Sequence, residues 1–164
     1  MKEMYPKLRG EGLLGATSGV AGLALLLTAI APPAFAGQAN TDDSEQIARG
    51  GKLYALHCAS CHGVRLEGQP DWRRRNPDGR LPAPPHDETG HTWHHPDQFL
   101  FGITRDGFAA YAPDGYETDM PGFASVMSDE EIWAVLAFIK SHWPERIRAR
   151  RRAAEHRMEM ETRQ

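Results

Sequence analysis

Apolar residues first follow a helical pattern between residues 44 and 57. Ser44 is suited to capping the start of this helix, and one face carries residues at three- and four-residue steps: Ile47, Gly50, Gly51 and Tyr54. Glycine on such a face lets a second helix axis approach closely, because no side chain keeps the two backbones apart. We predict a helix that ends at about His57 and packs against another helix.

A second amphipathic helix is predicted after residue 128. Ser128-Asp129-Glu130-Glu131 is a capping box that places acidic residues in the first helical turn. One stripe then carries the apolar residues Ile132, Val135, Leu136 and Ile139. Pro144 stops this helix, because proline lacks the backbone N–H that a helix interior needs.

A shorter helix is expected between these two. Pro96 opens it and Gly107 closes it, and its apolar residues are Phe99, Leu100 and Ile103. No alternating pattern of useful strand length occurs in the sequence. We therefore expect an all-α domain with long loops.

The N-terminal segment has the features of an export signal. Basic residues at positions 2, 7 and 9 precede an almost wholly apolar run from residue 20 to 31, and Ala34-Phe35-Ala36 matches a cleavage site. We predict that residues 1–36 are a signal peptide and that the protein is periplasmic. The alternative is an uncleaved membrane anchor, because residues 12–41 are uncharged and spanning a bilayer takes about 20 mostly apolar residues.

Charge divides the rest of the chain into a body and a tail. Residues 37–144 contain 16 acidic residues and 9 lysines or arginines, whereas residues 145–164 contain 7 arginines and 4 glutamates. An acidic body argues against nucleic acid as a partner. We predict one domain over residues 37–144 and a solvated, frayed or disordered Arg-rich tail. Docking of the tail to an acidic partner or a lipid surface is the alternative.

Both cysteines of the chain lie in Cys58-Ala59-Ser60-Cys61-His62. This spacing is what covalent attachment of c-type haem requires, since each thiol forms a thioether with one haem vinyl group and the histidine then lies against the iron. We interpret Cys58 and Cys61 as the covalent haem-binding residues and His62 as the proximal ligand of the haem iron. A domain of this size buries little apolar surface of its own, and the largely apolar haem would add to its core.

Two other kinds of site use paired cysteines. A redox-active pair is expected at a helix N-terminus after a strand, but the residues before Cys58 predict a helix. A structural zinc site usually needs four ligands, and the nearby imidazoles have no common zinc-finger spacing: His86, His91, His94 and His95. Copper or zinc binding by these four histidines is a separate hypothesis, although Pro96 disfavours a helical pair of His91 and His95.

The chain resembles the class I c-type cytochromes over most of residues 44–144. The resemblance rests on Gly50 and Tyr54, on the haem motif, on Asp119-Met120-Pro121-Gly122-Phe123 and on residues 128–140. It implies one covalent haem c and a close crossing of the first and last helices. Gly50 would lie at the crossing, with Gly51 as the alternative, and Tyr54 would pack against Val135 and Phe138.

The second axial ligand of the iron in such haem proteins is a methionine or a histidine. The resemblance implies Met120, whereas Met127 is better placed to fill the core under the last helix. The resemblance also suggests that the proline segment at residues 81–85 holds the other ring nitrogen of His62 through a backbone carbonyl. Pro84 is the best candidate for this carbonyl, and an extended polyproline connector is the alternative.

Two loop segments depart from the general family pattern, at residues 72–75 and 86–95. Trp72 or Trp93 could donate an indole N–H to a haem propionate, and an arginine could neutralise one. The alternative is a loop that forms an aromatic lid.

These observations predict an exported monohaem cytochrome c that carries one electron between a donor and an acceptor redox protein. It would be an electron-transfer protein rather than an enzyme, and a monomer or a complex subunit. Membrane contact is expected only through an uncleaved signal or the basic tail. The alternatives are a fixed electron-entry subunit of a periplasmic oxidoreductase complex, and a haem enzyme or sensor whose sixth ligand can be displaced.

Overall fold

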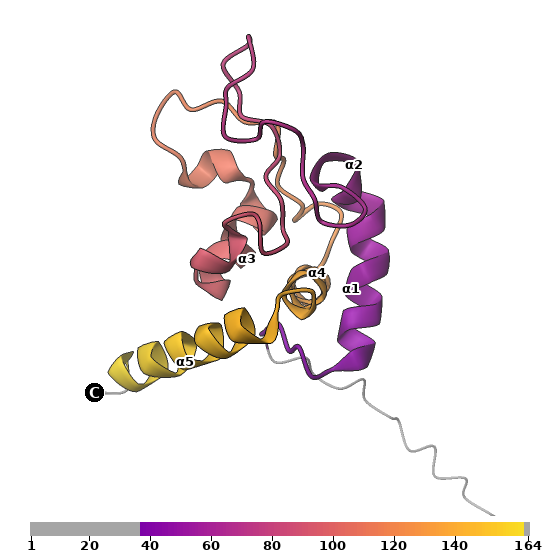
Figure 1. Cartoon of the computed structure of the whole chain (residues 1–164), viewed down its shortest axis with the longest axis vertical. Coiled ribbons are helices and arrows are strands. Elements are labelled where there is room, and N and C mark those ends of the chain that lie inside the picture. The colour runs from indigo at the N-terminus through magenta and orange to yellow at the C-terminus, as the bar shows by residue number, and fades with distance from the viewer. Residues whose placement is uncertain (1–36, 163–164) are drawn as a thin grey trace, which may run out of the picture. The chain divides into compact units, whose positions relative to one another are not determined.

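The computed structural model describes residues 37–162, and its secondary-structure elements there are helices. Its α-helices are α1 (Ser44–His57), α2 (Ala59–His62), α3 (Asp97–Asp106), α4 (Asp129–Ser141) and α5 (Glu145–Thr162) (Figure 1). Two short 3-10 helices, η1 (Thr92–His94) and η2 (Phe108–Tyr111), lie in the connections, and residues 37–162 contain no strand. The prediction of an all-α domain with long loops is confirmed.

The predicted signal segment, residues 1–36, lies outside the described residues. Among the helices of residues 37–162, none has both the length and the apolar character needed to cross a membrane.

The residue that caps α1 is Asp43 rather than Ser44, which corrects the predicted start by one residue. The carboxylate Oδ1 of Asp43 accepts hydrogen bonds from the backbone N–H groups of Glu45 and Gln46, each at 3.0 Å. A carboxylate binds these N–H groups more strongly than a hydroxyl and also interacts favourably with the positive end of the helix dipole. Ser44 therefore becomes the first residue of α1.

Helices α1 and α4 cross in close contact at Gly50. A Cβ atom at Gly50 would lie 1.8 Å from the carbonyl oxygen of Ala134, so only glycine fits. A Cβ at Gly51 would instead meet the ring of Phe138, at 3.1 Å, and a side chain can shift where a backbone cannot. Gly50 is therefore the crossing residue, as the family resemblance implied. One turn later Tyr54 packs on Phe138, with ring centroids 5.3 Å apart.

The ends of α3 and α4 follow the predicted capping signals. The hydroxyl of Ser128 accepts a hydrogen bond from the N–H of Glu131 at 3.3 Å, and the Glu131 carboxylate accepts one from the Ser128 N–H at 2.9 Å. Pro96 occupies the N-cap position of α3, and Gly107 ends that helix with a φ of +89°, which favours glycine. Helix α4 ends at Ser141, before Pro144.

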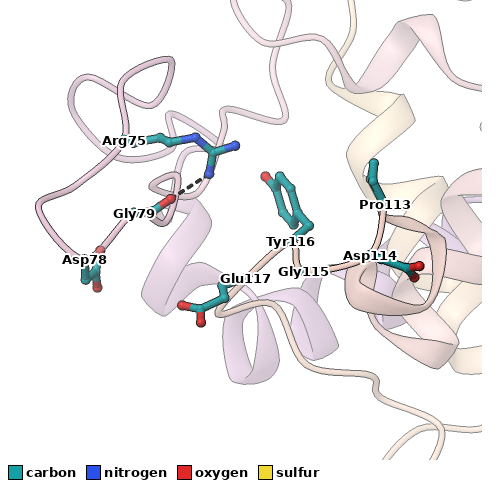
Figure 2. A pocket seen from close by; sticks show the side chains of 8 residues that line it. All are labelled: Arg75, Asp78, Gly79, Pro113, Asp114, Gly115, Tyr116 and Glu117. Carbon is teal, nitrogen blue, oxygen red and sulfur yellow. Dashed lines mark hydrogen bonds between the residues drawn. The ribbon is translucent and has the colours of Figure 1, made fainter.

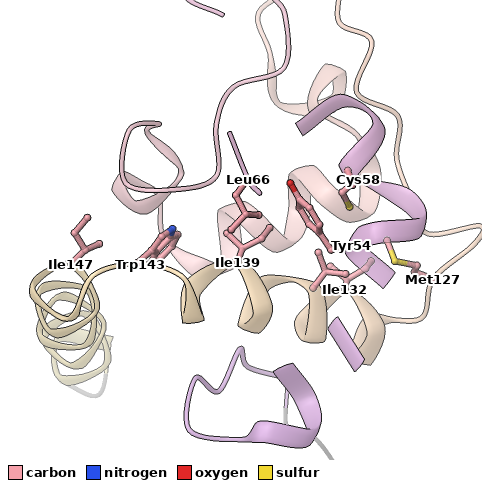
Figure 3. Packing of buried hydrophobic residues seen from close by; sticks show 10 residues of the cluster. Tyr54, Cys58, Leu66, Met127, Ile132, Ile139, Trp143 and Ile147 are labelled. Carbon is pink, nitrogen blue, oxygen red and sulfur yellow. The ribbon is translucent and has the colours of Figure 1, made fainter. Parts of the chain in front are cut away.

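The main apolar core lies between α1, α4 and the start of α5 (Figure 3). Its buried residues are Tyr54, Cys58, Ala59, Leu66, Met127, Ile132, Val135, Ile139, Trp143 and Ile147. Met127 is 4% exposed within this core, which confirms its predicted position under the last predicted helix. A smaller cluster of Leu100, Trp133 and Leu136 joins α3 to α4. The core thus brings Cys58, at the end of α1, against residues from the far end of the chain.

The prediction of a frayed or disordered tail is wrong for residues 145–162, which form α5. Ile147 is buried in the main core, and Arg151 is also buried. The sequence of α5 has no apolar stripe that would have indicated this packing. Its first turns are instead attached to the body by one apolar residue and a set of buried charges.

These charges form a cluster that we call the ion-pair quartet, defined by Asp97, Lys140, Arg151 and Glu155. Arg151 lies 3.2 Å from the Asp97 carboxylate and 2.8 Å from the Glu155 carboxylate, and Lys140 pairs with both acids. Burial, followed by the charge of Asp97, raises the pKa of Glu155. Removing one member would leave an uncompensated buried charge. The quartet therefore connects α3, α4 and α5.

Candidate functional site

The two cysteines and His62 lie together, directly after α1. Cys58 is the single residue between α1 and α2, and its carbonyl accepts a hydrogen bond from the His62 N–H at 2.9 Å. The hydroxyl of Tyr54 donates to the carbonyl of Gly63 at 2.9 Å and thus ties α1 to the end of this segment. Both thiols are free, with Cys58 buried and Cys61 exposed. The helical geometry places two thiols and an imidazole within one short turn.

The other end of the imidazole is held by the proline segment. The Nδ1 atom of His62 lies 2.8 Å from the carbonyl oxygen of Pro84, so Nδ1 carries the proton and donates it. The prediction that Pro84 supplies this carbonyl is confirmed. Burial lowers the pKa of His62, and the hydrogen bond to Pro84 opposes this effect in part. A neutral imidazole with its proton on Nδ1 presents the lone pair of Nε2 to a metal.

A turn at residues 66–69 is hydrogen-bonded to the backbone on both sides of Pro84. The N–H of Gln69 donates to the Ala83 carbonyl at 2.9 Å, and the N–H of His86 donates to the Leu66 carbonyl at 2.8 Å. A Cβ at Gly68 would lie 2.4 Å from the backbone nitrogen of Pro85, so glycine is required for this approach. Leu66 adopts a φ of +68°, a strained conformation for a leucine. The backbone here is shaped to hold the proline segment in place.

His86 stacks directly on His62. The two ring centroids are 4.0 Å apart with an interplanar angle of 21°. The hydroxyl of Thr92 lies 2.8 Å from Nδ1 of His86 and fixes this ring. The backbone carbonyl of His86 accepts a hydrogen bond from the indole N–H of Trp143 at 2.8 Å. Burial, together with the neighbouring His62 and His91, lowers the pKa of His86 well below its usual value. A neutral ring therefore flanks the neutral His62.

Met120 comes from a separate loop that is bound to the end of α3. The N–H of Phe123 donates to the carbonyls of Thr104 and Arg105, and the N–H of Ala124 donates to the Arg105 carbonyl, all at 3.0 Å. Met120 itself is half-buried, and its N–H donates to the hydroxyl of Thr118 at 3.1 Å. The loop that carries the thioether is thus fixed at one end by backbone hydrogen bonds.

Arg80 connects this loop to the proline segment. Its Nη1 lies 2.7 Å from the carboxylate of Asp119, next to Met120, and its Nε lies 3.5 Å from the carboxylate of Glu117. The Nε atom is buried and makes no hydrogen bond among the described residues. Arg80 therefore bridges the segment that holds His62 and the loop that carries Met120. Sequence reasoning missed Arg80, Trp143 and the stacking of His86 on His62, because their partners are distant in the sequence and follow no periodic pattern.

An open hollow of about 500 Å³ lies beside this bridge (Figure 2). Two loops line it, and their residues are Arg75, Asp78, Gly79, Pro113, Asp114, Gly115, Tyr116 and Glu117. The guanidinium of Arg75 donates to the Gly79 carbonyl at 2.6 Å and lies over the ring of Tyr116, 5.2 Å from its centroid. The lining is polar and contains none of the predicted cysteine, histidine or methionine site residues. The hollow is therefore not the predicted haem site.

The histidine segment forms aromatic stacks. Trp72 stacks on His91 and Trp93 stacks on His94, with ring centroids 5.3 and 3.7 Å apart. The indole N–H of Trp93 donates to the Glu88 carbonyl at 3.4 Å, which favours the lid interpretation over a propionate contact. His95 is extended, as Pro96 predicts. Within residues 37–162 no three His, Cys, Asp or Glu side chains are grouped to hold a metal ion.

The residues present fit a covalently bound haem. Two unpaired thiols lie three residues apart, and Nδ1 of the adjacent histidine is hydrogen-bonded to the Pro84 carbonyl. Burial raises the pKa of the Cys58 thiol to about 12, so this thiol is neutral and suited to an apolar setting. A thioether there would place no charge in the core that Cys58 shares with Tyr54.

Comparison with known proteins identifies the family of this chain. The family model for cytochrome c matches residues 47–143, which is more than half of the chain. A relative from Corynebacterium efficiens, the cytochrome c subunit of its cytochrome bc1 complex, is 42% identical over 60 residues, which cover 37% of this chain and 20% of that relative. The chain thus matches a fifth of the length of this relative, and no solved structure matches the chain. This chain belongs to the cytochrome c family and carries covalently bound haem c.

Proposed function

We propose that this protein is an exported one-electron carrier between larger redox proteins. Family membership supports electron transfer as its function. In the proposal, Cys58 and Cys61 form the thioethers, His62 is the proximal ligand of the iron and Met120 is the distal ligand. The observation that carries it is the 2.8 Å contact between His62 Nδ1 and the Pro84 carbonyl, in a segment that also presents two free thiols.

The haem supplies the one-electron chemistry when it is bound. The protein holds the proton of His62 on Nδ1 through Pro84 and keeps the imidazole plane fixed between this hydrogen bond and the stacked His86. A fixed ligand plane lowers the reorganisation that accompanies each change of charge, because the ring does not have to turn. His62, Pro84 and His86 thus support electron transfer.

Met120 closes the distal side in this proposal. A thioether ligand favours the ferrous over the ferric state and so raises the midpoint potential. Burial acts in the same direction, since the ferric state carries one more positive charge. Attachment of the Met120 loop to α3 through Phe123 and Ala124 would keep oxygen and peroxide from this position.

A matched pair of methionine variants tests the ligand assignment. Met120→Leu and Met127→Leu each remove one sulfur while keeping the side-chain volume, a change that usually costs under about 1.5 kcal/mol of stability. We expect Met120→Leu to lower the midpoint potential, within the roughly 0.8 V range that axial ligands span, and to let carbon monoxide bind ferrous iron rapidly. Met127→Leu should leave both properties unchanged. The reverse result would assign the ligand to Met127, and rapid carbon monoxide binding by the wild type would favour a haem enzyme or sensor.

Export rests on the sequence of residues 1–36 and is tested separately. The holo protein produced in a Gram-negative host should fractionate with the periplasm, and its mature N-terminus should lie near Gly37 by mass spectrometry. Retention of residues 1–36 in the membrane fraction would instead support an uncleaved anchor.

A second candidate function is that of a fixed cytochrome c subunit in a redox complex. The observation that favours it is the similarity to the cytochrome c subunit of a bc1 complex. A complex subunit would co-purify with stable partners in mild detergent at physiological salt, whereas a mobile carrier would elute alone. Native electrophoresis stained for haem in the source cells distinguishes the two.

A further inference from the structure

Helix α5 presents arginines from a firmly held position. Ile147 anchors its first turn in the main core, and the ion-pair quartet holds its second and third turns through Arg151 and Glu155. These contacts cover one side of α5 only. Arginines on its other sides are exposed: Arg146, Arg150, Arg152 and Arg157. A fixed helix presents such charges at a lower entropic cost than a mobile tail would.

A groove of about 190 Å³ separates α5 from the η1 segment. Trp93 and His94 form one wall, and the other wall consists of the α5 residues Ile147, Arg150, Arg151, Ala154 and Arg157. The ring stack of Trp93 on His94 makes the first wall flat and aromatic. The groove therefore combines an aromatic surface with guanidinium groups, the residue types enriched at protein interfaces.

Two of the arginines that line the groove are available to a partner. Arg151 is neutralised by Asp97 and Glu155, and outside the groove Arg148 and Arg152 both pair with Glu145. Among the side chains that the structure describes, by contrast, Arg150 and Arg157 form no ion pair. They are seven residues apart on one helix, which corresponds to about 10 Å along its axis.

We propose that this groove binds an acidic segment of a partner protein, with Arg150 and Arg157 pairing with two of its carboxylates. In a polyproline II segment, which has three residues per turn, residues three apart lie on the same side and are separated by about 9 Å, close to the spacing of the two arginines. Planar guanidinium groups bind carboxylates in a bidentate manner, and Trp93 would cover the chain between them. The proposal concerns the groove and not the iron, so it holds whether or not Met120 is the distal ligand.

The features of the groove favour a polypeptide over a lipid surface. A concave groove accepts a chain, whereas a bilayer presents a broad surface. Among the described side chains of α5, the exposed large apolar ones are two methionines, at positions 158 and 160, which give little area for insertion into a membrane. The body at residues 37–144 is acidic, so the basic groove would also orient an acidic partner toward this end of the protein.

Binding of a defined peptide to the holo protein tests the proposal. The probe is a synthetic 12-residue peptide of four Glu-Gly-Ser repeats, and its Gln-Gly-Ser counterpart is the uncharged control. Titration calorimetry at low salt compares the wild type with Arg150→Ala/Arg157→Ala. The matched control is Arg74→Ala/Arg146→Ala, which removes the same charge at exposed arginines outside the groove. Circular dichroism verifies that each variant keeps its helices.

We expect the glutamate peptide to bind, the glutamine peptide not to bind, and Arg150→Ala/Arg157→Ala to weaken binding at least tenfold. The control variant should weaken it less than threefold. Equal losses in the two variants, or no binding by the wild type, would overturn the proposal. Tighter binding to phosphatidylglycerol vesicles with the same arginine dependence would assign the groove to lipid. Self-association that depends on these arginines would assign it to a second copy of the chain.

Discussion

The crossing of α1 with α4 and the loop around Met120 are stabilised by different kinds of contact. At the crossing, a backbone carbonyl occupies the space that any side chain at Gly50 would need, and buried rings pack beside it. The Met120 loop has few buried apolar residues and is held by backbone hydrogen bonds to α3 and by the exposed ion pairs of Arg80. The crossing therefore tolerates almost no change, whereas the loop is open to adjustment.

This difference separates two properties of the protein. Packing at the crossing determines whether the domain folds, because close-packed interiors respond to a change of a single methyl group. The Met120 loop determines how the distal side of the iron is ligated, because it carries the distal ligand in our proposal. Variants in the first region should change the free energy of unfolding, and variants in the second should change the properties of the iron.

The largest effect is expected from Gly50→Ala. Its Cβ would lie 1.8 Å from the Ala134 carbonyl oxygen, so the helices must move apart. We expect a loss of about 3 kcal/mol or more in the free energy of unfolding, more than the roughly 1 kcal/mol that alanine contributes to a helix. Gly51→Ala is the control, with a change within about 1 kcal/mol because the Phe138 ring can shift. Urea unfolding of both holo proteins measures this, and equal stabilities would refute the crossing as a rigid contact.

Trp143→Phe is the next largest change, and it affects the contact between the main core and the His62 side of the site. It removes the indole N–H that pairs with the His86 carbonyl, and a lost buried hydrogen bond costs about 1–3 kcal/mol. We also expect the midpoint potential to shift, because His86 stacks on His62. Trp133→Phe, in the smaller α3–α4 cluster, should lower stability while leaving the potential unchanged. A potential that moves equally in both variants would show that general loosening, not the contact to His86, is responsible.

Arg80→Ala is expected to act mainly on the iron. Its ion pairs are partly exposed, so the free energy of global unfolding should fall by less than about 1 kcal/mol. The Met120 loop should open more often. If the free energy of opening falls by about 1 kcal/mol, carbon monoxide should bind ferrous iron roughly fivefold faster. Arg74→Ala, an exposed arginine outside this bridge, serves as the control. Unaltered carbon monoxide kinetics in Arg80→Ala would show that Arg80 does not restrain the loop.

The smallest effect concerns the pH dependence of the α4 cap. Hydrogen bonding to the Ser128 N–H, followed by the contact with Arg49, lowers the pKa of Glu131 below its ordinary value of 4.5. A lowered pKa in the folded state means that this stabilisation is present at neutral pH and is lost as the pH falls below about 4.5. Glu131→Gln should therefore be slightly less stable at pH 7 and less sensitive between pH 5 and pH 3. Parallel pH profiles for variant and wild type would exclude this contribution.

The predictable parts of the molecule were those that depend on local sequence. Periodicity and capping signals located α1, α3 and the start of α4 to within about one residue, and the family resemblance identified Gly50 and Pro84. Helix α4 ends at Ser141, a little before the predicted stop at Pro144. The contact between Trp143 and His86 was not predictable, because 57 residues separate the two and neither lies in a repeating pattern. Helix α5 was missed for a related reason, since buried ion pairs replace the apolar stripe by which a packed helix is normally recognised.

Helix α4, whose Ala134 meets Gly50 at the crossing, comes late in the chain, and this has a consequence for how the protein matures. Synthesis proceeds from the N-terminus, so Cys58 and Cys61 are made long before the helix that covers α1. Until α4 arrives, α1 is an isolated helix of 14 residues, a length that is only marginally stable in water, and the Cys58 thiol stays accessible. In the folded domain the same thiol is buried. For the proposed thioethers, this order allows haem to reach the Cys58 thiol before α4 packs against α1.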